Sequence, residues 1–201
     1  GFLFPTLARA SQMGLDITTP YYLNLAPDYD ALMTPRFTEF GGTTLGTKIR
    51  HMNADSEQSL YFNWALSDPN STQQRWLTEF NHKGQISPTL SSSIHIKRVS
   101  DAEVFNDFDL TQAANETNSL ASKAQVNYQG DNVWLSSASL ALITHQNLTT
   151  STPAYDQLPH ASLAGGATIA TYPVPATGRY QLDLIHFTRD TSYLAANSQL
   201  T

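Results

Sequence analysis

The chain has 201 residues, of which 14% are charged and 40% hydrophobic, and its formal net charge is −6 at pH 7. Only 11 of its residues are Lys or Arg, which argues against a nucleic-acid partner because phosphate binding needs clustered cations. The absence of cysteine excludes disulfides, thiolate metal sites and cysteine nucleophiles within this sequence. No run of about 18 apolar residues is present, so the sequence predicts no membrane-spanning helix.

Alternation of apolar and polar residues dominates the chain and predicts strands from its amino-terminal part onward. The first expected strand, 15–25, places Leu15 and Leu23 on one face and Asp16 and Asn24 on the other. The remaining expected strands are 29–37, 45–52, 60–66, 76–80, 94–97, 120–128, 133–143, 162–172 and 179–188. The pattern predicts an all-β protein of about ten strands. Two long connections, 100–118 and 145–159, interrupt it.

Pro20 and Pro35 lie inside the first two expected strands. Proline is unfavourable there because it has no backbone N–H and removes one potential hydrogen bond from the ladder. The simplest interpretation is an edge strand that is protected against aggregation.

Two environments fit the alternation. A soluble β-sandwich alternates, and so does an outer-membrane barrel with apolar residues outward, polar residues toward a wet lumen and aromatic residues at both interfaces. Several aromatic residues lie near the ends of expected strands: Tyr21, Tyr22, Trp64, Trp76, Tyr128, Trp134, Tyr172 and Tyr180. Composition alone leaves both architectures open.

Several ordered stretches resemble a known family. They are Gly1-Phe-Leu-Phe-Pro5, the segment from Pro20 to Arg36, Arg75-Trp-Leu with Asn81-His-Lys-Gly84, Val99-Ser-Asp-Ala-Glu-Val-Phe-Asn-Asp-Phe-Asp109, and Tyr155-Asp-Gln-Leu-Pro159. Together they closely resemble the start of the barrel domain of the LptD family, the lipopolysaccharide-assembly proteins of the outer membrane, also known as organic solvent tolerance proteins.

The resemblance implies the amino-terminal part of an antiparallel transmembrane β-barrel of roughly two dozen strands. Residues 1–201 are then expected to form one partial barrel domain, an open curved sheet with two unpaired edges when isolated. The family's jellyroll domain would precede it and the remaining strands would follow. The start at Gly1, without an initiator methionine or a signal peptide, agrees with an excised or processed piece.

The resemblance also implies a function in the bacterial outer membrane, where lipopolysaccharide would be inserted into the outer leaflet through a lateral gate near the first strand. The implied partners are lipopolysaccharide, a plug lipoprotein in the barrel lumen, and periplasmic bridge proteins that connect through the jellyroll domain. The expected gate residues are Pro20, Tyr21, Tyr22 and Pro35, and the expected loop motif is Phe105, Asn106, Asp107, Phe108 and Asp109. Leu23 and Phe37 should face lipid, whereas Asn24 and Thr38 should face the lumen.

Rival functions have weaker support. The six histidines lie in no Gly-x-Ser-x-Gly or His-Glu-x-x-His motif, so we expect no enzyme, cofactor or metal site. Asp101, Glu103, Asp107 and Asp109 lack the spacing of a calcium loop, so a solvated acidic loop is expected. A general porin-type channel and a soluble carbohydrate-binding β-sandwich remain as alternatives.

Overall fold

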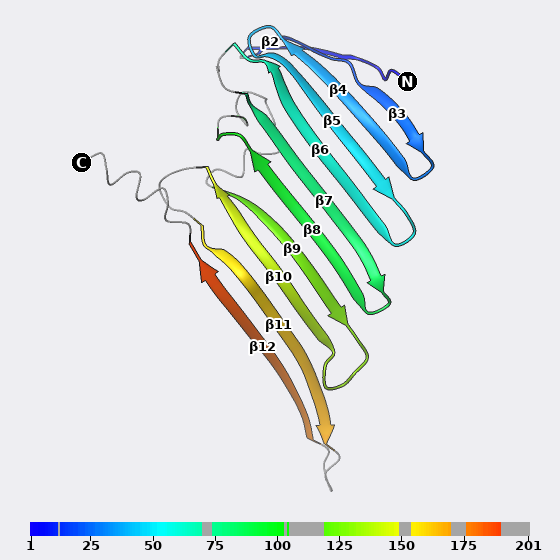
Figure 1. Ribbon diagram of the computed structural model, residues 1–201, viewed down its shortest axis with the longest axis vertical. Coiled ribbons are helices and arrows are strands. Elements are labelled where there is room, and N and C mark those ends of the chain that lie inside the picture. The colour runs from blue at the N-terminus through cyan, green and yellow to red at the C-terminus, as the bar shows by residue number, and fades with distance from the viewer. Residues whose placement is uncertain are drawn as a thin grey trace, which may run out of the picture.

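A computed structural model of the chain describes residues 1–11, 13–69, 74–102, 104, 119–148, 154–169 and 176–189. Most of them lie in one antiparallel sheet, seen as a twisted array of strands in Figure 1. Its strands are β1 (Thr6–Ala10), β2 (Gly14–Thr18), β3 (Tyr21–Ala26), β4 (Tyr29–Thr38), β5 (Gly42–Met52), β6 (Ser56–Ser67), β7 (Trp76–Ser87), β8 (Leu90–Val99), β9 (Ser119–Gln129), β10 (Ser137–Asn147), β11 (Asp156–Ile169) and β12 (Ala176–Thr188). Among the described residues, no helix is long and apolar enough to cross a membrane.

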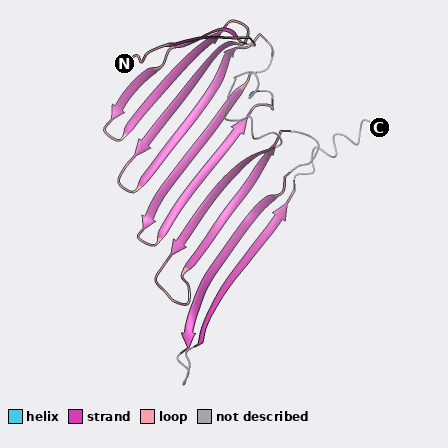
Figure 2. Cartoon of the chain, turned by 180° about the vertical axis from the view of Figure 1, so that it is seen from behind, coloured by secondary structure: helices cyan, strands magenta, loops and turns pink. Residues whose placement is uncertain are grey.

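The sheet is a single layer with two edges. Its strands follow chain order from β1 to β12, except that β2 and β3 lie end to end along the same side of β4. Seen from behind, the same strands again form one layer (Figure 2). In the part of the chain that the structure describes, no strand pairs with the outer side of β1 or β12. The all-β open sheet is therefore confirmed, and the two-sheet sandwich is not what these strands form.

The structure differs from the expected strands at the amino-terminal edge. Residues Thr6–Ala10 form β1, which the sequence pattern did not predict because its alternation is short and weak. The expected first strand is split into β2 and β3, and the split falls at Thr19–Pro20. Both pieces pair with β4, so they act as one interrupted strand, β2–β3.

The ladder registers divide the sheet into a polar and an apolar face. Facing residues of antiparallel strands lie on the same side, so a row of partners can be followed across the sheet. One row from β3 to β9 reads Asn24, Asp30, Arg50, Ser59, Asn81, His95 and Lys123. The adjacent row from β3 to β8, on the opposite face, reads Leu23, Ala31, Ile49, Leu60, Phe80 and Ile96. The predicted facing of Leu23 against Asn24 agrees with these rows.

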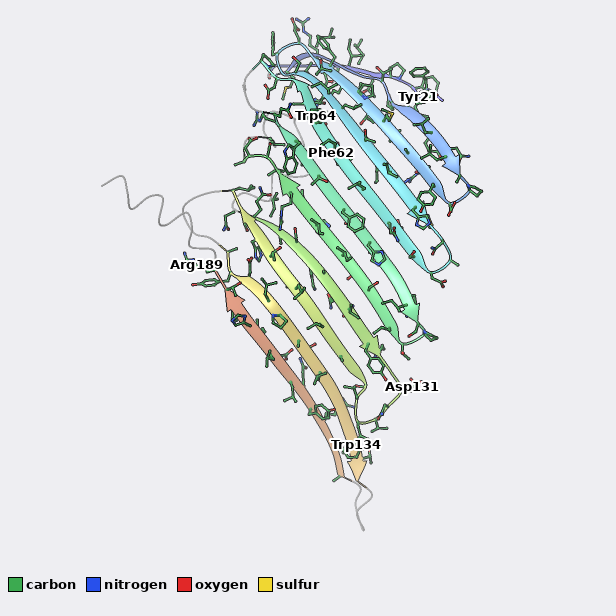
Figure 3. All side chains as sticks on the ribbon, viewed as in Figure 1. Tyr21, Phe62, Trp64, Asp131, Trp134 and Arg189 are labelled. Atoms are coloured by element: carbon green, nitrogen blue, oxygen red, sulfur yellow. The ribbon has the colours of Figure 1, made fainter. Side chains whose placement is uncertain are left out.

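Aromatic residues border the apolar face near both ends of the strands. Trp64 faces Trp76 at one end, where β6 finishes and β7 begins. Tyr128 and Tyr180 lie toward the opposite end. Figure 3 shows Trp64 near one end of the strands and Trp134 near the other. This distribution is typical of a barrel wall with two membrane interfaces.

The largest buried cluster lies where β8 and β9 separate. Their ladder runs from Leu90↔Tyr128 only to His95↔Lys123. Beyond that point Ala65, Leu77, Val99, Val104 and Leu120 form a hydrophobic cluster. Val104 and Leu120 are fully buried, so the start of the 100–118 connection is held against the sheet.

Side chains replace backbone pairing at this separation. The Lys97 backbone N–H donates to Ser122 Oγ at 3.2 Å, and Ser122 Oγ donates to the Lys97 carbonyl at 3.3 Å. The Gln146 side-chain amide accepts from the Val99 N–H at 3.0 Å and donates to the Val99 carbonyl at 2.7 Å. The Gln146 amide therefore satisfies both backbone groups of Val99, as a strand partner would.

Candidate functional site: the proline break and the polar face

The predicted gate residues lie together at one interruption of the sheet. The ladder between β2 and β4 covers only Asp16↔Thr38 to Thr18↔Arg36, and the ladder between β3 and β4 resumes at Tyr21↔Met33. By contrast, the ladder between β4 and β5 continues without a shift from Tyr29↔His51 to Thr38↔Gly42. The interruption is thus confined to the seam between β2–β3 and β4, and we call it the proline break.

Pro35 accounts for the hydrogen bond that is missing between β2–β3 and β4. The Thr19 N–H donates to the Pro35 carbonyl at 3.0 Å, so the polar groups of Pro35 point toward β2–β3. In a hydrogen-bonded antiparallel pair the reciprocal bond would run from residue 35 to the carbonyl of Thr19. Proline has no N–H, so that bond cannot form. The lost bond is worth roughly 0.5–1.5 kcal/mol net in water-soluble proteins.

Pro20 removes a donor from a different seam. Its carbonyl accepts from the Leu3 N–H at 2.9 Å, so its polar groups point away from β4 and toward the amino-terminal residues. The two prolines therefore weaken the two opposite sides of the same strand, β2–β3. Sequence reasoning placed both prolines in neighbouring strands but did not assign them to separate seams.

Tyr21 and Tyr22 lie on opposite faces beside the break. Tyr21 faces Met33 on the apolar side, and its ring meets the ring of Phe2 edge-on with centroids 4.8 Å apart. The Tyr22 hydroxyl donates to Asp30 Oδ2 at 3.2 Å on the polar side. Tyr21 stands at the amino-terminal edge of the sheet in Figure 3.

Two ion pairs brace the polar face around the break. The Arg36 guanidinium binds both carboxylate oxygens of Asp16, with its shortest distance 2.6 Å, and joins β4 to β2. The Arg50 guanidinium binds Asp30 in the same two-pronged manner, with distances of 2.8 and 2.6 Å, and joins β5 to β4. Sequence reasoning missed both pairs, although each joins charged residues at even positions of neighbouring strands.

A shallow groove crosses the polar face at the end of the sheet that carries the short turns. Its volume is about 530 Å³. Its walls are mostly uncharged polar residues, and the charged residues that line it are Asp55, Glu57 and Lys83. A smaller hollow beside it is lined by Glu57, Ser59, Asn81, His82 and Lys83. Hydroxyl and amide groups of this kind suit a hydrated ligand such as a saccharide better than an apolar one.

The predicted loop motif, Phe105 to Asp109, lies outside the described residues. The structure does describe Asp101, at the start of that connection. Asp101 binds the buried Arg75 guanidinium, with Oδ1 at 2.7 Å from Nη2, and Arg75 also reaches Asp68 at 3.3 Å. The interpretation of a simply solvated acidic loop therefore fails for Asp101, because its carboxylate anchors the connection to the start of β7.

These features define a class of protein. A single antiparallel layer with a polar face, an apolar face and aromatic residues toward both strand ends is a segment of an all-β barrel wall.

The comparisons with known proteins narrow this class. A family model described as LptD, LPS transport system D, matches residues 73–200. The chain belongs to the LptD family.

Curated relatives agree with this assignment. A protein from Aromatoleum aromaticum is 32% identical over 163 residues, which is 81% of this chain and 20% of the relative. One from Pseudomonas entomophila is 30% identical over 200 residues, covering 94% of this chain and 21% of the relative. One from Chromohalobacter salexigens is 35% identical over 144 residues, covering 65% of this chain and 17% of the relative. All three are named LPS-assembly protein LptD, and this chain spans about a fifth of their length.

Proposed function

We propose that the protein moves lipopolysaccharide into the outer leaflet of the bacterial outer membrane, and that its lateral gate lies at the edge formed by β2–β3. The observation that carries the proposal is the proline break in a wall that is polar on one face and apolar on the other. Membership of a family whose relatives are named LPS-assembly protein supports the choice of lipid.

The physical argument starts from the amphiphile. Lipopolysaccharide has a saccharide part that prefers water and acyl chains that prefer hydrocarbon. Moving either part through an intact wall with one polar and one apolar face therefore has a high free-energy cost. A seam between strands lets the two parts stay on opposite faces while the molecule moves sideways. Proline interrupts the pairing on both sides of β2–β3. The short β8–β9 ladder, by contrast, is supplemented by side-chain hydrogen bonds and by a buried cluster, so β2–β3 is the edge that we expect to open.

The same proposal includes the domains and partner proteins outside these residues. We place a jellyroll domain before these residues and the remaining barrel strands after them, with periplasmic bridge proteins reached through the jellyroll domain. A plug lipoprotein would occupy the lumen against the polar face. The hydrated groove on that face supports a path for the saccharide part.

The test is the double substitution Pro20→Ala and Pro35→Ala in the full-length protein. Each alanine restores a backbone donor to one side of β2–β3, so we expect tighter pairing and slower arrival of newly made lipopolysaccharide at the cell surface. Pro88→Ala is the matched control, because Pro88 lies in the tight turn between β7 and β8 rather than in a ladder. Surface delivery at the normal rate in the double variant would refute the gate.

A further inference from the structure

An aromatic residue interrupts the polar face on β12. The polar row that reaches Lys123 on β9 continues to Ile143 on β10. From there it runs to Gln157 on β11 and to Phe187 on β12. Phe187 is 55% exposed, although the same row carries polar or charged side chains on every strand from β3 to β9. Single exposed apolar residues are common on protein surfaces, so the surroundings of this ring decide whether it matters.

Phe187 forms a cluster with Tyr155 and Arg189, which we call the aromatic patch. The ring of Tyr155, which is 52% exposed, meets the Phe187 ring edge-on with centroids 6.4 Å apart. The Arg189 guanidinium lies over the Tyr155 ring, 5.3 Å from its centroid, and Nη1 is 3.5 Å from the Tyr155 hydroxyl oxygen. Figure 3 shows Arg189 at the end of β12. Two exposed rings and a cation from two segments of the chain therefore meet at one point of the polar face.

Hydrogen-bonding side chains border the aromatic patch on the same face. Gln157 lies directly opposite Phe187, and Gln157 Oε1 is 3.1 Å from His160 Nδ1. The other ring nitrogen of His160, Nε2, is 3.9 Å from Asp183 Oδ1. The His160 and Asp183 side chains are 32% and 44% exposed, so solvent reaches both. The surroundings of the patch thus offer amide, imidazole and carboxylate groups beside the rings and the guanidinium.

This combination of groups suits a sugar ring. The C–H groups on one side of a pyranose form an apolar surface that packs on the negative face of an aromatic ring, while its hydroxyl groups need donors and acceptors around the rim. A guanidinium supplies several N–H donors and also attracts any anionic substituent of a saccharide. Two rings and one guanidinium are far smaller than the roughly 800 Å² that each partner buries in a stable protein interface. The patch therefore fits a saccharide better than a protein partner.

The aromatic patch lies at the end of the sheet that carries the longest connections. Arg189 follows β12 directly, at the end where the 100–118 and 148–155 connections also lie, whereas the opposite end carries tight turns such as 88–89. Barrels of the outer membrane keep short turns on the periplasmic side and longer loops outside. By this rule the patch belongs to the outer mouth of the barrel, and the shallow groove on the polar face belongs to the periplasmic end.

We propose that the aromatic patch binds a sugar ring of the saccharide part of lipopolysaccharide at the outer mouth of the barrel. Phe187 is the surface on which the sugar ring stacks, and Arg189 donates hydrogen bonds to its polar substituents. The inference rests on the proposed function and deepens it, because it names residues that recognise the saccharide. A contact at this place would hold the saccharide on the polar face while the acyl chains stay in hydrocarbon.

Binding of a free oligosaccharide tests the aromatic patch. The oligosaccharide that mild acid releases from lipopolysaccharide lacks the acyl chains, so its binding reports only on the saccharide. Its affinity for the purified full-length protein in detergent would be measured by a saturation-transfer NMR titration. Phe187→Ala should bind it about tenfold more weakly, because the stacking surface is lost. Phe187→Tyr keeps an aromatic ring and should bind it normally.

The matched control is Leu184→Ala, which removes a large side chain, 63% exposed, from the opposite face of the same strand and should leave binding unchanged. Equal affinity of Phe187→Ala and the unsubstituted protein would overturn the saccharide site, and so would a lack of binding by the unsubstituted protein. Loss of the plug lipoprotein from Phe187→Ala with saccharide binding intact would also overturn it, because the patch would then be a protein contact. These results leave the proposed function standing. That function fails if removing the whole protein from cells leaves surface lipopolysaccharide unchanged.

Discussion

Arg75 is a buried cation that ties two connections to the sheet. Its side chain is 3% exposed and lies between Asp68, which is 5% exposed, and Asp101. Taking charges out of water is costly, so the pairing is what makes this burial tolerable. The arrangement fixes the segment after β8 close to the start of β7, where Val104 enters the hydrophobic cluster.

Arg75→Ala should therefore lower the free energy of unfolding by about 3–5 kcal/mol, because it removes the buried cation that pairs with the carboxylates of Asp68 and Asp101. Urea unfolding of the purified full-length protein in detergent measures the change. The control is Arg50→Ala. Arg50 is 54% exposed, and an ion pair at the surface contributes only about 0–1 kcal/mol. Equal effects of the two substitutions would show that Arg75 is not the anchor described here.

At the scale of the elements, the side-chain amide of Gln146 takes the place of a strand partner for Val99 where β8 separates from β9. Gln146→Leu keeps a side chain of similar size but leaves the N–H and carbonyl of Val99, which is 2% exposed, without hydrogen bonds. We expect a loss of about 1–3 kcal/mol in stability and faster hydrogen exchange at the Val99 amide.

The matched change is Gln181→Leu, which removes only a contact to Asp183 on the exposed strand β12. If the Val99 amide exchanges as slowly in Gln146→Leu as in the unsubstituted protein, another group must accept its hydrogen bond. Figure 1 shows β8 and β9 diverging toward the end of the sheet where this contact lies.

The sequence predicted most strands because period-two alternation is a local signal. The alternation of Leu23 with Asn24 and of Val126 with Asn127 was sufficient to assign faces as well as strands. It could not reveal β1, since Thr6–Ala10 is short and its pairing with β2 depends on the register of the folded sheet. Nor could it reveal that Gln146 replaces a strand partner, because that contact joins residues 47 positions apart.

The assignment of gate residues stays a prediction, but their positions in the sheet can be compared with the sequence. Family resemblance pointed to Pro20, Tyr21, Tyr22 and Pro35, and the structure brings them to one break. Which neighbouring strand loses a hydrogen bond at each proline depends on the ladder register. A local stretch of sequence does not encode that register. The bracing pair Arg36–Asp16 depends on the same register.

At the scale of the whole molecule, we propose that the sheet separates water from hydrocarbon. One face carries rows of polar and charged side chains, and the other carries large apolar residues such as Leu140, Leu182 and Leu184, which are 51%, 61% and 63% exposed. An apolar face of this extent on a single layer is consistent with the lipid-facing side of a barrel wall. The proposed gate requires that the two faces of the sheet meet different solvents.

Spin labels on consecutive residues test that claim most directly. Labels would be placed singly at Leu23, Asn24, Val126 and Asn127 of the full-length protein in lipid vesicles, because each consecutive pair lies at one depth on opposite faces. Labels at Leu23 and Val126 should collide with lipid-soluble oxygen and be shielded from a water-soluble nickel chelate. Labels at Asn24 and Asn127 should show the reverse. Equal access to the chelate at all four positions would contradict the partition, and with it the gate built upon it.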